Sequence, residues 1–457
     1  MKTLLIIGAG PGGYECAVRA AKAGLDVHIA DRADHVGGTC LNEGCIPTKC
    51  LCHSAETLEA ARAATALGIQ ADCSSFSLAQ AMAHKDQVTA SLQTGIHTLL
   101  STPGITFHAA EARFAPNNPH KVYLGEEELQ ADYVFIATGS LPKFLPIPGA
   151  HTPGVLTSTE LLQLTEVPAR LCIIGGGVIG LEFASIFRSF GSEVTVIEYC
   201  KEILPNFDTD IAKRLRTSLK KRGITFITGA PVTAIHADET RNGELHVSYE
   251  YRNAVKDLLA DKVLMAVGRG PNLDSLNLAD AGIDFTPRGI TVDAHFQTSQ
   301  PGIYAVGDIN GICQLAHAAT FQSYHALAHI LGEVEQDTTP LDLIPAAVFT
   351  TPEAAMVGLT EEAARTTHSD IKMGKAYYRA NGRALTMDAA GDGLVKLIAT
   401  PTGELLGAHI LGTHAAELIH ELTLVIRLKG TVNDLRHTIH AHPTLSELIL
   451  QAAEALE

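Results

Sequence analysis

The fold is decided by residues 4–13, which read Leu4-Leu5-Ile6-Ile7-Gly8-Ala9-Gly10-Pro11-Gly12-Gly13. An apolar strand leads into glycines spaced Gly-x-Gly-x-x-Gly, an alanine-rich helix is expected over residues 14–23, and a second strand at 27–30 ends at Asp31. In such a βαβ unit the glycines let the backbone approach a pyrophosphate at the helix N-terminus, and the acid binds ribose hydroxyls. The residues predicted to bind this dinucleotide are Gly8, Gly10, Gly13 and Asp31.

The same pattern returns later in the chain. A strand at 171–174 leads into a second glycine fingerprint, and a strand at 194–197 ends at Glu198. The offset from the first glycine to the acid is 23 residues in both copies, which indicates an internal repeat and two dinucleotide sites. A carboxylate at Glu198 repels a 2′-phosphate and favours NAD over NADP, and a solvated acid at a strand end is the alternative. The residues predicted to form this site are Gly175, Gly177, Gly180 and Glu198.

A third stretch carries redox chemistry and reads Gly37-Gly38-Thr39-Cys40-Leu41-Asn42-Glu43-Gly44-Cys45-Ile46-Pro47-Thr48-Lys49. Positions five apart in a regular helix are roughly 8.6 Å apart, whereas a disulfide needs roughly 4.4–6.8 Å between Cα atoms. A Cys40–Cys45 bond is therefore possible only if the backbone tightens, which Gly44 permits. Pro47 suits the first turn of a helix that would begin near Cys45, and that position together with Lys49 would lower the pKa of the Cys45 thiol. The alternative is two unpaired core cysteines beside a turn.

Taken whole, this stretch resembles the redox-disulfide segment of the class I pyridine nucleotide–disulfide oxidoreductases, and within that family it is most similar to the dihydrolipoamide dehydrogenases. The resemblance runs over almost the whole chain. It implies a redox-active Cys40–Cys45 disulfide, with FAD in the first dinucleotide site and NAD in the second. Gly38, Thr39 and Lys49 are implied to lie at the flavin.

Further segments resemble those that surround the two dinucleotides in this family. Strands at 133–137, 263–267 and 303–306 each end in a glycine-containing turn. The resemblance implies that Asp308 binds a ribityl hydroxyl and that Ala316 and His317 cover the flavin. Ala318 and Gln322 depart from the Lys and Glu usual there, which puts a charge interaction near the flavin in doubt. The further cofactor residues implied are Thr138, Gly139, Gly268, Asp308, Ala316 and His317.

The last stretch with candidate catalytic residues reads His440-Ala441-His442-Pro443-Thr444-Leu445-Ser446-Glu447. Pro443 keeps His442 out of the α conformation, and Thr444 can cap the helix that carries Glu447. A histidine held by a carboxylate is the arrangement of a general base with a fixed tautomer. The stretch resembles the catalytic His-Pro and Glu of the family, which come from the other subunit and imply an obligate homodimer. A packed histidine cluster is the alternative, and His440 alone is expected to be structural.

Lys49 and Glu182 form a further predicted pair. Glu182 lies early in the helix after the second fingerprint, where the family places an acid opposite the active-site lysine. Buried together, the pair would keep the lysine charged near the flavin, and two unrelated surface charges are the alternative. Cys50 and Cys52 are expected to be small buried hydrophobes, with an auxiliary redox thiol at Cys52 as the alternative.

The composition sets the class of protein. The chain has 457 residues, 46% of them hydrophobic, and a formal net charge of −16, which argues against binding to nucleic acid or an acidic membrane surface. No apolar run approaches the ~18 residues that cross a bilayer, and the apolar run at residues 4–7 is too short for a signal peptide. Nine cysteines are too few for a secreted disulfide scaffold, so a cytoplasmic location is expected, and no metal site is predicted.

We predict an α/β fold with two Rossmann-like dinucleotide-binding domains and a C-terminal α+β dimerisation domain. The expected division is an FAD-binding domain over 1–149, an NAD-binding domain over 150–270, a second, central part of the FAD-binding domain over 271–340, and a dimerisation domain over 341–457.

The activity implied by the resemblance is oxidation of dihydrolipoyl groups with reduction of NAD⁺. His442 would remove a thiol proton, Cys40 would form the mixed disulfide, and Cys45 would face the flavin. The implied partners are a second copy of the chain and the lipoyl domain of a 2-oxo acid dehydrogenase E2 component or the glycine cleavage H-protein. Glu198 disfavours a glutathione reductase-type enzyme, and residues 452–457 lack the cysteine pair of a mercuric reductase type. A flavoprotein scaffold without turnover is the remaining alternative.

Overall fold

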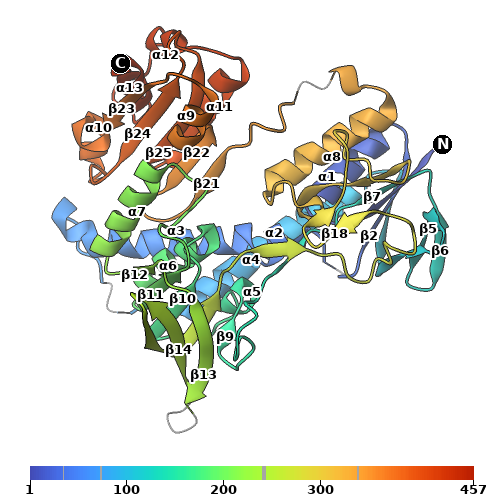
Figure 1. The fold of residues 1–457 in the computed structure, drawn as a ribbon, viewed down its shortest axis with the longest axis horizontal. Helices are drawn as coiled ribbons and strands as arrows, with labels where there is room; N and C mark the ends of the chain where they lie inside the picture. The colour runs from blue at the N-terminus through green and yellow to red at the C-terminus, as the bar shows by residue number, and fades with distance from the viewer. Residues whose placement is uncertain (34, 73–74, 239–242, 337–338, 457) are drawn as a thin grey trace. The chain divides into compact units, whose positions relative to one another are not determined.

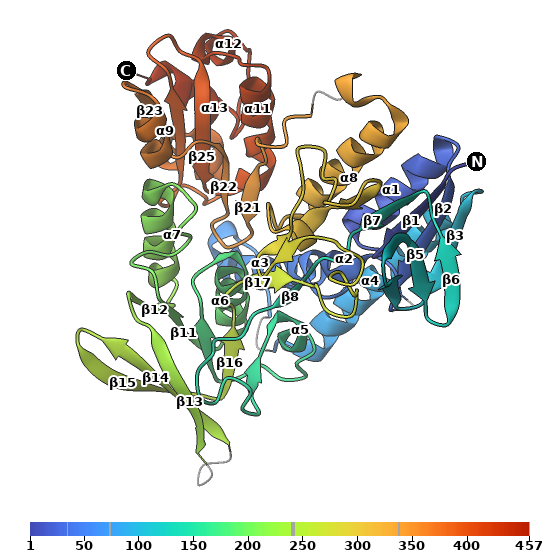
Figure 2. The ribbon, with the colours of Figure 1, turned by 45° about the vertical axis from the view of Figure 1, so that its right-hand side comes forward.

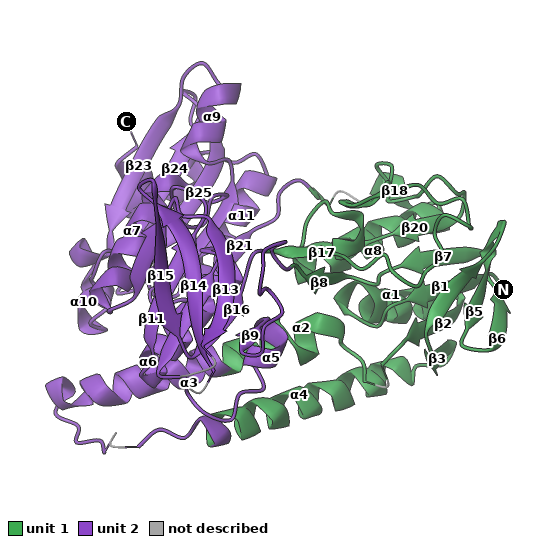
Figure 3. Ribbon diagram, turned by 60° about the horizontal axis from the view of Figure 1, so that its bottom comes forward, with its two compact units in different colours: residues 1–50, 80–143, 268–341 green, residues 51–79, 144–267, 342–457 purple. Residues whose placement is uncertain are grey.

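The computed structural model describes residues 1–33, 35–72, 75–238, 243–336 and 339–456. Figure 1 follows the chain from its N-terminus to its C-terminus. The chain forms two compact units, which Figure 3 colours separately. Unit 1 comprises residues 1–50, 80–143 and 268–341, and unit 2 comprises residues 51–79, 144–267 and 342–457. Each unit is described by itself.

Unit 1 is built on a five-stranded parallel sheet in the order β20-β7-β1-β2-β3. Its strands are β1 (Thr3–Ile7), β2 (Asp26–Asp31), β3 (Ile105–Ala109), β7 (Tyr133–Ile136) and β20 (Ile303–Ala305). Leu4 and Ile6 belong to one hydrophobic cluster, and Leu5 and Ile7 belong to another. Because side chains alternate along a strand, the central strand is buried on both faces, as expected for a parallel sheet.

Two helices of unit 1 pack side by side, α1 (Pro11–Lys22) and α8 (Ala316–Leu331), as Figures 1 and 2 show. A Cβ on Gly12 would lie 3.2 Å from the carbonyl oxygen of Ala319, so small residues allow this close packing. Unit 1 also contains α2 (Gly38–Asn42), the first residues of α3 (Cys45–Ala63) and most of α4 (Leu78–Leu100). A small antiparallel sheet contains β4 (Ala112–Ala115), β5 (Asn118–Leu124) and β6 (Glu127–Gln130).

The first sheet of unit 2 repeats the arrangement of unit 1, with the parallel order β12-β11-β10-β16-β9. Its strands are β9 (Val155–Leu156), β10 (Arg170–Ile174), β11 (Glu193–Glu198), β12 (Thr225–Thr228) and β16 (Lys262–Met265). The helix α6 (Val178–Phe190) joins β10 to β11 as α1 joins β1 to β2. The predicted repeat of a dinucleotide-binding βαβ unit is therefore confirmed. An antiparallel sheet of β13 (Val232–Asp238), β14 (Glu244–Tyr251) and β15 (Ala254–Ala260) follows.

The C-terminal part of unit 2 is an antiparallel sheet in the order β21-β22-β25-β24-β23. Its strands are β21 (Ala346–Val348), β22 (Ala354–Gly358), β23 (Lys372–Tyr377), β24 (Leu394–Ala399) and β25 (Leu405–Leu411). The helices α11 (Ala415–Arg427), α12 (Val432–Arg436) and α13 (Glu447–Glu454) contribute buried apolar residues to the core that Val395 and Ile410 of the sheet share.

A buried ionic junction in unit 2 links the C-terminal antiparallel sheet to the segment that precedes the helix after β11. The Nζ atom of Lys396 on β24 lies 2.8 Å and 2.9 Å from the carboxylate oxygens of Asp208 and 2.7 Å from that of Glu361. Asp208 precedes α7 (Thr209–Lys221), where its carboxylate accepts a hydrogen bond from the Asp210 amide. It also accepts one from the amide of Glu361, the first residue of α9 (Glu361–Thr367). One carboxylate therefore serves two helix N-termini and a buried ammonium group.

The predicted four-part domain division stays a prediction. The second Rossmann-like sheet and the C-terminal antiparallel sheet fall in the same compact unit. Among the described residues, no helix is both long enough and apolar enough to cross a membrane.

Candidate active site and cofactor-binding loops

The first glycine fingerprint forms a tight loop between β1 and α1. Gly8 has φ +111°, and a Cβ there would lie 2.3 Å from the carbonyl oxygen of Ala137. A Cβ on Gly13 would lie 1.9 Å from the carbonyl oxygen of Gly8. At Gly10 the nearest atom to a Cβ would be 3.8 Å away, so the space above this residue is open. This is the cradle that a pyrophosphate needs to approach the N-terminus of α1.

The second fingerprint, between β10 and α6, repeats these features. Gly175 has φ +112°, and a Cβ there would lie 2.2 Å from the carbonyl oxygen of Ala266. A Cβ on Gly180 would lie 2.1 Å from the carbonyl oxygen of Gly175. A Cβ on Gly177 would have no atom within 4 Å. The loop therefore fits a second dinucleotide at the N-terminus of α6.

In each βαβ unit, the acidic residue at the end of the second strand, Asp31 or Glu198, also hydrogen-bonds to the glycine loop. The Asp31 carboxylate accepts hydrogen bonds from the amide of Ala9, at 2.8 Å, and from the amide two residues further along, at 3.0 Å. Glu198 accepts from the amide of Gly176 and from the amide two residues further along, at 2.6 Å. Both carboxylates are thereby oriented by the backbone, as expected for groups that accept hydrogen bonds from ribose hydroxyls.

Cys40 and Cys45 lie next to each other at the break between α2 and α3. Both are thiols in the structure, and their side chains share a hydrogen bond. This bond and burial raise the pKa of Cys40, while the charge of Lys49 opposes the rise. A Cβ on Gly44 would lie 2.9 Å from the carbonyl oxygen of Thr39. The backbone between Cys40 and Cys45 is therefore tight at Gly44, as a bond between the two cysteines requires. The Cys40–Cys45 disulfide itself stays a prediction.

The helix α3 begins at Cys45, with Lys49 one turn later. Asn42, which sequence reasoning missed, holds the preceding helix in place. Its Nδ2 atom donates to the carbonyl oxygens of Val36, at 3.0 Å, and Gly38, at 2.9 Å. Its Oδ1 atom accepts from Gln93 on α4 at 2.6 Å. No local signal marked Asn42, because its partner on α4 is distant in sequence.

A buried polar network surrounds Asp308. Ser140 donates from its hydroxyl to the Asp308 carboxylate at 2.5 Å and accepts from Nε of Arg269 at 2.8 Å. Burial raises the pKa of Asp308, and Ser140 and Arg269 oppose the rise. Ser140 and Arg269 were also missed, although each directly follows a predicted residue, Gly139 or Gly268. The network fits a carboxylate that is oriented to accept a hydrogen bond from a ribityl hydroxyl.

The helix α8 begins at Ala316, and His317 is its second residue. The Oε1 atom of Gln322, also on α8, accepts from the amide of Gly307 at 2.8 Å and from Nδ2 of Asn310 at 2.9 Å. The neutral side-chain amide of Gln322 therefore fixes the turn that contains Asp308.

The predicted acid–base pair is formed in unit 2. Nδ1 of His442 lies 2.9 Å from Oε1 of Glu447, and the side chains are 79% and 22% exposed. The hydrogen bond from His442 is the main cause that lowers the pKa of Glu447. The predicted cap at Thr444 is wrong. Its hydroxyl donates to the Ala441 carbonyl at 2.7 Å, and Ser446 occupies the N-cap because the loop runs two residues further.

Glu182 is 3% exposed, and its Oε1 atom accepts from the amide of Phe349 at 3.0 Å. Lys49 belongs to unit 1 and Glu182 to unit 2, so their predicted pairing stays a prediction. Cys52 is buried and donates to the carbonyl oxygen of Phe349 at 3.3 Å, whereas Cys50 is half-buried.

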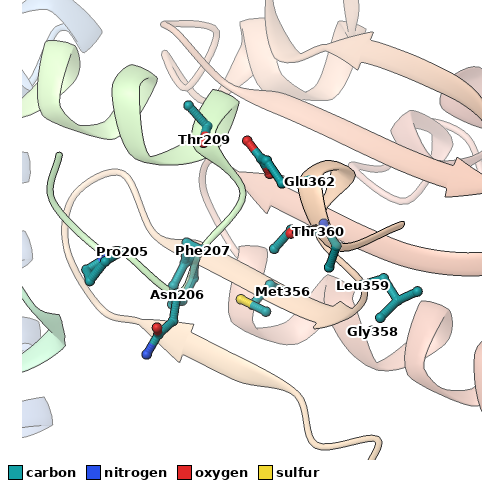
Figure 4. Close-up of a pocket in the computed structure, with 10 residues that line it drawn as sticks. Pro205, Asn206, Phe207, Thr209, Met356, Gly358, Leu359, Thr360 and Glu362 are labelled. Atoms are coloured by element: carbon teal, nitrogen blue, oxygen red, sulfur yellow. Dashed lines mark hydrogen bonds between the residues drawn. The ribbon is translucent and has the colours of Figure 1, made fainter. Parts of the chain in front are cut away.

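Unit 2 also has an open depression of about 440 Å³ between the segment before α7 and the turn from β22 into α9 (Figure 4). It is lined by Pro205, Asn206, Phe207, Thr209, Met356, Gly358, Leu359, Thr360, Glu362 and Ala363. None of these is a predicted site residue. In the part of the chain that the structure describes, no group of three or more His, Cys, Asp or Glu side chains is placed to hold a metal ion.

Comparisons with known proteins agree with this geometry. Residues 2–323 match the family described as pyridine nucleotide-disulphide oxidoreductase, and residues 344–453 match the dimerisation domain of the same family. The chain belongs to this family.

Similar proteins cover the whole chain. A dihydrolipoyl dehydrogenase of Thermus scotoductus is 42% identical over 465 residues, which cover 100% of this chain and 98% of the relative. A dihydrolipoyl dehydrogenase of Staphylococcus aureus is 40% identical over 459 residues, which cover 98% and 95%. The solved structure of the HOCl-induced flavoprotein disulfide reductase RclA from Escherichia coli is 33% identical, with a TM-score of 0.87 and 99% of each chain covered.

As a pyridine nucleotide–disulphide oxidoreductase, this enzyme works with FAD and NAD. The open space at Gly10 and Gly177 fits two dinucleotides, and the adjacent Cys40 and Cys45 fit a redox-active pair. The dimerisation domain over residues 344–453 supports a homodimer. The predicted fold class, family and cofactors are confirmed.

Proposed function

We propose that this enzyme oxidises dihydrolipoyl groups to the lipoyl disulfide while it reduces NAD⁺ to NADH. The observation that carries the proposal is the contact between the Cys40 and Cys45 side chains at the tight turn between α2 and α3. The names of the relatives from Thermus scotoductus and Staphylococcus aureus support the choice of a dihydrolipoyl substrate.

The reaction starts from a Cys40–Cys45 disulfide and a substrate with two thiols. His442, oriented by Glu447, removes the proton of one thiol. The thiolate attacks Cys40, a new S–S bond to the substrate forms, and Cys45 leaves as a thiolate. The second substrate thiol then displaces Cys40, which closes the lipoyl disulfide and leaves both cysteines reduced. With FAD at the Gly8–Gly13 loop and NAD⁺ at the Gly175–Gly180 loop, the flavin would supply the redox chemistry that carries the two electrons of the Cys40–Cys45 dithiol to NAD⁺.

The two cysteines are differentiated by their surroundings. The pKa of Cys40 is raised by its hydrogen bond with Cys45 and by burial, so Cys40 favours the thiol. Cys45 is the first residue of α3, and a helix N-terminus with Lys49 one turn later stabilises a thiolate. This asymmetry supports Cys40 as the residue that exchanges with substrate and Cys45 as the residue that faces the flavin.

The site residues are proposed in their predicted roles. FAD occupies the first site, at Gly8, Gly10, Gly13 and Asp31, and NAD occupies the second, at Gly175, Gly177, Gly180 and Glu198. The other flavin residues are Gly38, Thr39, Lys49, Thr138, Gly139, Asp308, Ala316 and His317, with Gly268 at the second dinucleotide. Glu182 pairs with Lys49, and the four predicted domain ranges are retained.

The partner subunit of the homodimer supplies His442 and Glu447. The macromolecular substrate is a lipoyl domain, either of a 2-oxo acid dehydrogenase E2 component or of the glycine cleavage H-protein. The location is cytoplasmic, which the few cysteines support.

The test is a steady-state comparison of dihydrolipoamide and reduced glutathione as donors, each with NAD⁺ and NADP⁺. We expect turnover with dihydrolipoamide and NAD⁺, and its loss in Cys40→Ser and Cys45→Ser. Cys172→Ala, which changes a buried cysteine of β10 outside the redox pair, serves as the control and should retain turnover. A preference for glutathione with NADP⁺, or full activity in Cys45→Ser, would refute the proposal.

A further inference from the structure

The loop between β11 and α7 folds over the second glycine fingerprint. The amide of Leu204 donates to the carbonyl oxygen of Gly176 at 3.0 Å, and the amide of Gly176 donates to the Glu198 carboxylate. A Cβ on Gly176 would lie 3.0 Å from Cγ2 of Ile203, so the absence of a side chain there lets the two segments touch. Residues at and after the end of β11 therefore hold the glycine loop by both backbone polar groups of Gly176.

The contact with Gly176 depends on an unfavourable backbone conformation at Leu204. This residue has φ +47°, in the left-handed region that residues with a side chain rarely adopt. Its side chain is buried, and its carbonyl oxygen accepts a hydrogen bond from the amide of Phe207 at 2.9 Å. A conformation of this kind persists only where the surrounding contacts hold it. The loop therefore needs an anchor close to Leu204.

An ion pair between Glu202 and Arg216 supplies that anchor. Oε1 of Glu202 lies 2.6 Å from Nε of Arg216, and Oε2 of Glu202 lies 2.8 Å from Nη2 of Arg216. This is the bidentate geometry in which a guanidinium group binds a carboxylate with the greatest specificity. Oε1 of Glu202 also accepts a hydrogen bond from the amide of Ile203 at 3.0 Å. Because Arg216 lies on α7, the pair fastens this segment to a helix that Asp208 of the buried junction caps.

We propose that Glu202 and Arg216 are positioning residues for NAD⁺. The inference rests on the proposed function, in which NAD⁺ occupies the second glycine fingerprint. The pair acts through Leu204 and Ile203, which both pack against Gly176. Without the pair, the segment is free to leave its strained conformation, and the glycine loop loses the support of the Gly176 carbonyl. Binding of NAD⁺ should then weaken, whereas steps that do not involve NAD⁺ should be unaffected.

The test measures the Kd of NAD⁺ for the FAD-loaded dimer by isothermal titration calorimetry. Glu202→Gln and Arg216→Gln should each raise this Kd by about 5–20-fold, because each removes the charged hydrogen bonds that order the loop. The double variant should bind NAD⁺ no more weakly than the single variants, since the two residues act as one unit. The KM for NAD⁺ should rise with the Kd, while the rate at which dihydrolipoamide reduces the flavin in the absence of NAD⁺ should stay unchanged.

Glu244→Gln is the matched control. Glu244 pairs with Arg170 at 2.7 Å, and these side chains are 27% and 30% exposed, close to the 20% and 25% of Glu202 and Arg216. Arg170 is the first residue of β10, whereas the glycine loop follows the last. Glu244→Gln should therefore lower the melting temperature to a similar extent and leave the Kd of NAD⁺ unchanged. An equal rise of this Kd in Glu244→Gln and Glu202→Gln would mean a purely structural role and would overturn the inference.

Gly177→Ala separates this inference from the proposed function. If Gly177→Ala weakens NAD⁺ binding and Glu202→Gln does not, or if the effects of Glu202→Gln and Arg216→Gln add, the positioning role is wrong while the NAD⁺ site stands. If neither Gly177→Ala nor Glu202→Gln changes the Kd, NAD⁺ does not bind at this loop, and the proposed function fails together with the inference.

Discussion

Lys396 and Asp208 form an ion pair that water does not reach. The Nζ atom of Lys396 lies 2.8 Å from Oδ1 of Asp208, and the two side chains are 1% and 0% exposed. Their partners are the helix N-termini of α7 and α9 and the carboxylates of Asp210 and Glu361. A buried charge without its partner is far more costly than an exposed one, so this pair makes the strongest stability prediction.

Lys396→Met should lower the free energy of unfolding by about 3–5 kcal/mol, because the Asp208 carboxylate would stay buried without a counter-ion. Chemical denaturation followed by circular dichroism measures the change. Lys375→Met is the matched control, since Lys375 pairs with Asp210 at the surface and its loss should cost less than about 1 kcal/mol. Equal effects of the two substitutions would contradict the buried junction.

The junction also predicts how stability depends on pH. His409 is the cross-strand neighbour of Lys396, and burial lowers its pKa. The unfolded chain takes up a proton on this imidazole below about pH 6.5, while the folded chain resists it. Stability should therefore fall as the pH drops from 7 to 5, and the fall should be smaller in His409→Gln. Melting temperatures across this range measure it, and parallel curves for the two proteins would exclude this role of His409.

A second pH window belongs to the carboxylates of the junction. The pKa of Asp210 is lowered to about 2, chiefly through hydrogen bonds from Lys375 and Lys396 against the effect of burial, and the pKa of Glu361 is lowered mainly by Lys396. A lowered carboxyl pKa contributes stability above its unfolded value, near pH 4, and this is lost as the pH falls further. Acid titration should therefore show a second loss of stability below about pH 4, and this loss should be smaller in Lys396→Met.

Glu198→Gln should weaken the discrimination between NAD⁺ and NADP⁺. The neutral amide no longer repels a 2′-phosphate, so the ratio of kcat/KM for NAD⁺ to that for NADP⁺ should fall by about 10–100-fold. Glu193→Gln, an exposed acid at the opposite end of β11, is the control and should leave the ratio unchanged. An unaltered ratio in Glu198→Gln would remove Glu198 from the nucleotide site.

Gly177→Ala and Gly175→Ala should separate nucleotide binding from folding. A Cβ on Gly177 meets no protein atom within 4 Å, so the melting temperature should hardly change while the KM for NAD⁺ rises at least about tenfold. A Cβ on Gly175 would lie 2.2 Å from a carbonyl oxygen at φ +112°, so that variant should be strongly destabilised. Thermal melts and NAD⁺ titrations measure both effects. An unchanged KM in Gly177→Ala would argue against a dinucleotide at this loop.

The parts of the site that could be predicted are those with local signals. The two fingerprints were predictable because Ala9 and Asp31, like Gly176 and Glu198, interact within one βαβ unit. The start of α3 at Cys45 followed from Pro47 and Gly44. His442 and Glu447 are five residues apart and meet where one loop enters α13.

The rest depended on contacts that sequence spacing does not reveal. Ser140, Asp308 and Arg269 form one network although 168 residues separate Ser140 from Asp308. Lys396 and Asp208 are 188 residues apart, and nothing near either marks the other. The misplaced cap at Thr444 has a different cause. Both Thr444 and Ser446 suit an N-cap, but α13 begins after Ser446, whose hydroxyl makes no cap hydrogen bond, and the Thr444 hydroxyl donates to the Ala441 carbonyl.

The junction at Asp208 has a mechanical consequence. The helix that follows the second βαβ repeat and the C-terminal antiparallel sheet share one anchoring carboxylate, so disruption of the Asp208–Lys396 pair should loosen both. Thermal or acid stress on unit 2 should thus unfold the second βαβ repeat and the dimerisation domain in a single cooperative step.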